Sequence, residues 1–87
     1  MTNKTEQLNG KEYQSVNALF AIPIGQAFNV QNIGPSKVKF HIGDAKPEVS
    51  TLNFRVLPAL PEVLLQVPSG EKEVFLLGNS QINAEVD

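Results

Sequence analysis

The sequence predicts an all-β fold: a small antiparallel β-sandwich, jelly-roll-like, with six or seven strands and a flexible N-terminal arm. Along most of the chain, apolar and polar residues alternate in short segments, and a period of two is that of a strand with one buried face. Six prolines and several glycines fall mainly in the gaps between these segments. Closely spaced strands separated by such turn signals are typical of antiparallel sandwiches and barrels.

Residues 1–11 predict a flexible arm, ahead of a single sandwich domain over residues 12–87. The arm is polar, and Leu8 is its one branched apolar side chain. Such a segment buries too little apolar surface to become ordered by itself. It is either a frayed end without a role or an arm that becomes ordered on a neighbouring surface.

Residues 13–22 fit two kinds of element. Val16, Ala18, Phe20 and Ile22 alternate as in a strand, whereas Tyr13, Val16 and Phe20 share one face of a helix. A proline directly after the segment ends either element. We favour a strand because the segments that follow are β-like.

The strongest signal in the chain lies in residues 27–42, which predict a β-hairpin. Gly34-Pro35 stands near the centre, where turn residues are expected. The alternating apolar positions of the two arms are Phe28, Val30, Val38, Phe40 and Ile42. Each arm therefore has one apolar face for the core and one face for solvent.

Two further strands are expected over residues 51–57 and 62–67. In the first strand, Leu52, Phe54 and Val56 share one face, which we assign to the core. Prolines mark the break between the two strands, as expected for residues that cannot continue a sheet ladder.

A second hairpin is expected over residues 73–86. Gly78-Asn79 is a two-residue loop of the kind that joins paired antiparallel strands. The register that follows from this loop pairs Phe75 with Ile82.

Composition limits the classes of function. The chain has 87 residues, no cysteine and a net charge of −2. A domain of this size without disulfides is marginally stable, and oligomerisation is the natural source of further stability. The mixed charges argue against a general binder of nucleic acids or anionic membranes. No apolar run reaches transmembrane length and no secretory signal begins the sequence, so we expect a protein made in the cytoplasm.

No residue set predicts catalysis, a cofactor or a metal, and we expect no enzyme. His41 is the one histidine, on the solvent face of its strand, without a nucleophile to serve. Scattered carboxylates and no cysteine make a poor set of metal ligands. Glu71 and Glu73 lie in an open, charged stretch, whereas a catalytic carboxyl pair needs one member in an apolar pocket.

Lys37, Lys39 and His41 form a short basic row, with Arg55 expected near it. An oligonucleotide-binding surface would combine such a row with exposed aromatic side chains. All five phenylalanines fall on faces assigned to the core, and there is no tryptophan. We therefore expect no nucleic-acid partner and no glycan surface.

Large apolar residues also fall on faces that should be wet: Leu19, Leu64, Val74 and Leu76. Either the strands that carry them are central and buried on both faces, or these residues form a subunit interface. The last two lie beside amide side chains, a mixture that suits an interface. The hypothesis is a homo-oligomer that associates through these four residues.

Turn and strand signatures recur along much of the chain: residues 28–32 (FNVQN), Val38 and Phe40, Pro47, residues 67–71 (VPSGE), Val74-Phe75 and Gly78. This series resembles that of small β-sandwich structural proteins of tailed bacteriophages, which include head decoration proteins, fibre proteins and small tail modules. The turn in VPSGE departs from their pattern by one inserted serine.

The resemblance implies a non-enzymatic virion protein that assembles with copies of itself, with a trimer favoured, and binds other virion proteins. It also implies localisation in the virion after synthesis in a bacterial cytoplasm. The alternative is a small β-sandwich or OB-like module that binds a glycan or an oligonucleotide. An exposed groove lined by aromatic residues would favour this alternative, and a flat apolar patch would favour assembly.

Overall fold

The computed structural model describes residues 2–52, 54–60 and 62–86, with side chains described from Lys4 onward. Over these residues the chain forms eight strands and one short helix, which confirms the all-β prediction. The helix α1 (Val16–Leu19) is a single turn, and no described helix is long and apolar enough to cross a membrane. The strands are β1 (Thr2–Gln7), β2 (Gln14–Ser15), β3 (Phe28–Gly34), β4 (Val38–Gly43), β5 (Arg55–Leu57), β6 (Leu64–Val67), β7 (Glu73–Leu77) and β8 (Gln81–Val86).

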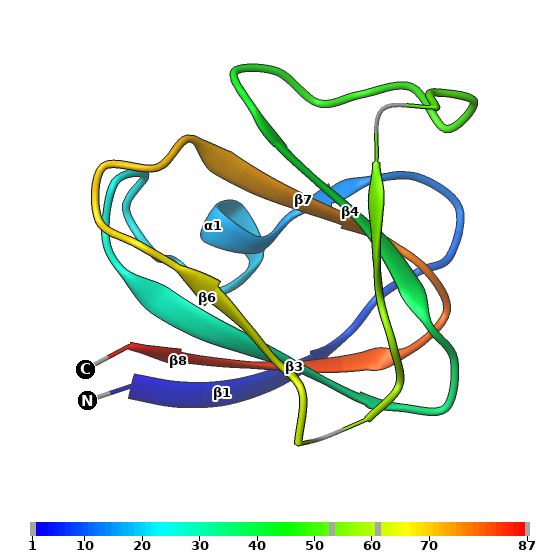
Figure 1. Cartoon of the computed structure of the whole chain (residues 1–87), viewed down its shortest axis with the longest axis horizontal. Coiled ribbons are helices and arrows are strands. Elements are labelled where there is room, and N and C mark those ends of the chain that lie inside the picture. The colour runs from blue at the N-terminus through cyan, green and yellow to red at the C-terminus, as the bar shows by residue number, and fades with distance from the viewer. Residues whose placement is uncertain (1, 53, 61, 87) are drawn as a thin grey trace.

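The strands form two antiparallel sheets that pack face to face (Figure 1). The first sheet has the order β1-β8-β3-β6 and the second sheet has the order β2-β7-β4-β5. The chain thus pairs β1 with β8, β2 with β7, β3 with β6 and β4 with β5, like one long hairpin wound around a core. Pairing of β3 with β8 and of β4 with β7 closes the winding. The sandwich is therefore a jelly roll.

Both predicted hairpins are wrong in their pairing. β3 and β4 belong to different sheets, and so do β7 and β8. Phe75 pairs with His41, and Ile82 pairs with a residue of β3. The chain crosses between sheets at each turn, so that the apolar faces of both arms meet across the core. Gly78 permits the second crossing, because a Cβ there would clash with the Val38 side chain.

Within the segment 1–11, which was expected to be a flexible arm, residues 2–7 form an edge strand. β1 pairs along its length with β8. Leu8, directly after β1, is 1% exposed, and its N–H donates to the Ser80 carbonyl oxygen at 3.0 Å. The prediction failed because backbone hydrogen bonds can order a polar edge strand without apolar side chains. The surface on which the segment becomes ordered belongs to the same chain.

The strand favoured over residues 13–22 exists only as the two residues of β2, and α1 follows it. Ser15 begins the helix, because its Oγ accepts a hydrogen bond from the Ala18 N–H at 3.1 Å. Val16 and Phe20 are both buried, as residues one helical turn apart should be. The helical periodicity of this segment was therefore the correct interpretation beyond Ser15.

The main core fills the space between the sheets and contains Val74 and Leu76, each 0% exposed. Their assignment to a wet face was wrong. Phe75 and Leu77 point to the opposite face of the second sheet, where they pack with Tyr13 in a second buried cluster. β7 is buried on both faces, which explains its run of four apolar residues.

A buried asparagine joins three segments at one end of the sandwich. Asn32, 0% exposed, lies near the end of β3. Its Nδ2 donates to the carbonyl oxygens of Ser36 at 2.7 Å and Leu57 at 3.2 Å. Its Oδ1 accepts from Ser80 Oγ at 2.6 Å and from the Gly34 N–H at 3.0 Å. One side chain therefore fixes the β3–β4 turn, the end of β5 and the start of β8.

The substitution Asn32→Ala is expected to lower the free energy of unfolding by about 2–4 kcal/mol, because buried donors and acceptors lose their partner. Urea denaturation measures the change. Asn79→Ala, in the exposed turn before β8, is the matched control and should stay within about 0.5 kcal/mol of the wild type. Similar small effects for both variants would contradict this role of Asn32.

Candidate functional site

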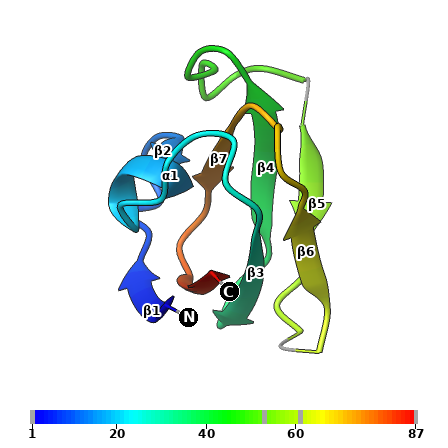
Figure 2. The same cartoon turned by 90° about the vertical axis from the view of Figure 1, so that its left-hand side faces the viewer.

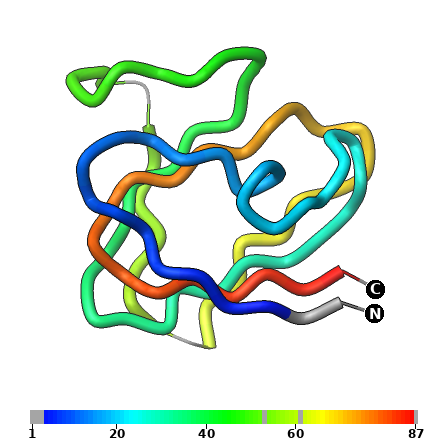
Figure 3. The backbone as a smooth tube through the Cα atoms, turned by 180° about the vertical axis from the view of Figure 1, so that it is seen from behind, coloured from blue at the N-terminus to red at the C-terminus, as the bar shows by residue number. Residues whose placement is uncertain are grey.

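Most of the exposed large apolar side chains lie in the part of the chain that contains β5 and β6. Among the described residues, five of the seven such side chains lie between positions 49 and 64. We call the side of the sandwich where these two strands lie the apolar side, and the exposed apolar residues in or near the strands are Val49, Leu52, Val56, Leu60 and Leu64. It is formed by the neighbouring edge strands β5 and β6, which face the viewer in Figure 1 and stand together at the right of Figure 2. β1 and α1 lie on the opposite side, nearest the viewer in Figure 3.

Side chains are exposed here because β5 and β6 are short. The register of β5 also differs from the alternation expected from the sequence. Val56 pairs with Lys39 on the solvent face, and it is 48% exposed. Leu57, the next residue, pairs with Val38 and is buried. The expected core face over residues 51–57 was therefore wrong for Val56, and also for Leu52, which is 90% exposed.

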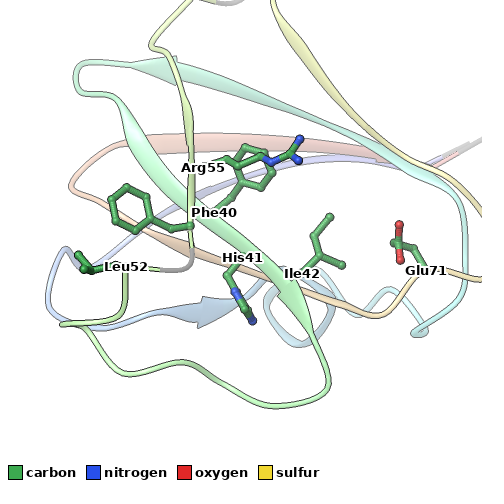
Figure 4. Close-up of a pocket in the computed structure, with 7 residues that line it drawn as sticks. Phe40, His41, Ile42, Leu52, Arg55 and Glu71 are labelled. Carbon is green, nitrogen blue, oxygen red and sulfur yellow. The ribbon is translucent and has the colours of Figure 1, made fainter.

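A hollow of about 450 Å³ opens beside β4 at one end of the apolar side (Figure 4). Its lining residues are Phe40, His41, Ile42, Leu52, Phe54, Arg55 and Glu71. Phe40 and Ile42 belong to the inner row of β4 but are only half-buried. The apolar interior is thus partly uncovered here, while the His41 side chain points to the other side of the strand.

Charged groups border this hollow. Arg55 pairs with Phe40 across β4 and β5 and is exposed. The Lys39 ammonium lies 4.6 Å from the centroid of the Phe54 ring, within cation–π range. The hollow therefore combines half-buried apolar side chains with charged groups, a mixture that suits contact with a protein partner.

Two members of the predicted basic row share one surface, but Arg55, which was expected near them, does not. Lys39 and His41 lie on the solvent face of the second sheet, whereas Arg55 shares the inner row with Phe40. The His41 ring is half-buried, with its centroid 6.4 Å from that of Phe75. Among the described residues, no group of three or more His, Cys, Asp or Glu side chains could hold a metal ion.

A second hollow, of about 710 Å³, lies on the solvent face of the second sheet, with Tyr13 and Phe75 among its lining residues. Lys46 and Glu12, also in the lining, form an ion pair of 2.9 Å. The Tyr13 hydroxyl is buried without a hydrogen-bond partner. Burial raises the pKa of Tyr13 above its ordinary value of 10.0.

The four residues proposed for a subunit interface do not come together. Val74 and Leu76 lie in the core. Leu19 is half-buried on α1 and packs against that core. Only Leu64, 45% exposed on β6, lies on the apolar side. The more exposed Leu52 was missed, because its alternation with polar neighbours looked like that of a core-facing strand.

Phe20 and Phe28 are buried in the core, as the sequence predicted, whereas Phe75 is buried in the second cluster on the opposite face of its sheet. Phe40 and Phe54 are half-buried and line the first hollow. No family model matches the chain, and it matches neither a curated protein nor a solved structure.

Tyr13→Phe is expected to leave the protein at least as stable at neutral pH, because it removes a buried hydroxyl that has no partner. Above pH 10.0 the unfolded chain ionises Tyr13 while the folded chain resists ionisation. Wild-type stability should therefore fall as pH rises from 10.0 toward the raised pKa, and this part of the loss should be absent in the variant. Urea titrations of both proteins below and above pH 10.0 measure the difference, and identical pH profiles would contradict the assignment.

Proposed function

We propose that the protein is a non-enzymatic structural component of a bacteriophage virion, which associates with copies of itself and docks onto other virion proteins. The observation that carries the proposal is the apolar side, where Leu52 is 90% exposed beside a hollow with half-buried aromatic residues. Several exposed apolar side chains in and near two edge strands of a small domain favour a contact with another protein.

The scaffold around this surface suits docking. Leu52 and Arg55 lie in or next to β5, which β4 holds in the sheet. Leu52 can insert into a depression on a partner, and the hollow beside it can receive a side chain of that partner. The charged groups at the rim would fix the orientation of the two proteins and contribute less to the affinity. The sequence resemblance to virion proteins gives the class of partner.

A binding module for a glycan or an oligonucleotide is the second candidate. It is favoured by the hollow itself, which holds two half-buried phenylalanines and Arg55. Base stacking needs open aromatic faces near a positive groove. Lys39 occupies one face of Phe54, and Leu52 in the lining is apolar, so the surface suits a protein partner better.

The test is association with virions. A tagged chain is expressed in a bacterium that carries the gene, virion formation is induced, and particles are banded in a density gradient. We expect the wild-type chain in the banded particles. Leu52→Glu should reduce its amount at least about tenfold, because a charge replaces an exposed apolar anchor.

Ile24→Glu is the matched control, because Ile24 is 61% exposed but lies outside the apolar side. It should leave the amount in particles unchanged. Absence of the wild-type chain from particles would overturn the virion role. Equal retention of the two variants would show that docking uses another surface.

A further inference from the structure

We propose that β6 pairs with β6 of a second copy, antiparallel and about a two-fold axis, so that the first sheets of two copies form one continuous sheet. The inference builds on the proposed function by naming a second copy as the partner of the apolar side. The two sheets have four edge strands, which are β1, β6, β2 and β5.

Three of these edges carry features that discourage pairing with another chain. β1 has Lys4 and Glu6 in the row of core residues Ala84 and Ile82, with the two charges 3.5 Å apart. β2 has two residues. β5 has three residues, and Arg55 lies in its inner row. Short edges and charges in the inward row are protections against edge-to-edge pairing.

β6 has no charge in its inner row, and with four residues it is longer than β2 and β5. Its sequence LLQV contains no charge, and it is the longer edge strand on the apolar side. Leu64 on its outer face is 45% exposed. An uncharged, partly apolar edge is a template for another strand.

The alternation of β6 selects the register. Leu65 and Val67 lie in the inner row, opposite Val30 and Phe28, whereas Leu64 and Gln66 lie in the outer row. Residues opposite each other in antiparallel strands point to the same face. With Leu65 on the two-fold axis, each Leu64 lies opposite Gln66 of the partner subunit, and inner residues meet inner residues. The register centred on Gln66 would instead place Leu64 opposite a proline, which cannot donate a hydrogen bond.

The apolar side, which faces the viewer in Figure 1, carries an edge strand of each sheet. The side also carries both signs of charge, with exposed Arg55 and Glu62, as a surface that meets a copy of itself requires. Antiparallel pairing of one edge closes at two copies, so the favoured trimer would need a different contact.

The experiment is sedimentation equilibrium of the purified chain over a wide concentration range, with charge variants of the outer row. The wild type should approach about 19 kDa, twice the 9.5 kDa of one chain. The double variant Leu64→Lys with Gln66→Lys places lysines opposite lysines, and dimerisation should weaken at least about tenfold. The double variant Leu64→Lys with Gln66→Glu places lysine opposite glutamate twice, and it should dimerise more strongly than the double-lysine variant.

Thr5→Lys, on the outer face of the β1 edge of the same sheet, is the control and should dimerise like the wild type. Circular dichroism shows that each variant is folded. A wild-type monomer at high micromolar concentration, or no difference between the two double variants, would overturn the proposal. Neither result changes the expected presence of the chain in particles, so this failure is distinct from a failure of the virion role.

Discussion

The hydrogen bonds of Asn32 are the constraint on which the arrangement of the sandwich depends. In a jelly roll most connections cross from one sheet to the other, so a few contacts at the ends of the sandwich decide which strand ends meet. Asn32 uses both ends of its amide group and is bonded to three separate segments. A buried amide with unmet hydrogen bonds is costly, so arrangements that separate these segments are disfavoured. Asn17 acts in the same way at the other end, where its Oδ1 accepts from the Val74 N–H at 3.0 Å and its Nδ2 lies 3.4 Å from the Pro23 carbonyl oxygen.

These polar contacts fix the connections that cross between the sheets. The two lateral sides of the sandwich differ from each other. On one side Leu8 and α1 fill the space at the edges, with Val16 and Phe20 in the core. On the other side β5 and β6 are short, and Phe40 and Ile42 remain half-buried. The polar strand β1 thus forms one edge of the first sheet, and the uncharged strand β6 forms the opposite edge. The proposed association uses the side on which β5 and β6 lie.

The sequence predicted the strands and turns better than their partners. Alternation located β3, β4, β6, β7 and β8, and turn residues located the reversals between them. Pairing was mispredicted because a turn signal shows where the chain reverses, whereas the sheet that receives the next strand depends on contacts with distant strands, such as Phe75 with His41. The run Val74–Leu77 did contain a usable signal, since four consecutive apolar residues indicate burial on both faces.

The apolar side was the part least accessible to sequence reasoning, although Leu64 was identified. Leu52 alternates with polar residues like a core residue, and only the short extent of β5 leaves it outside the sheet. Its exposure and the partial burial of Phe40 have one physical consequence for assembly. A partner that covers the hollow would complete the burial of inner-row residues of β4 and would bind the folded chain alone. Binding to the folded state alone stabilises it by mass action. Folding and assembly of this small domain would therefore reinforce each other through the same side chains.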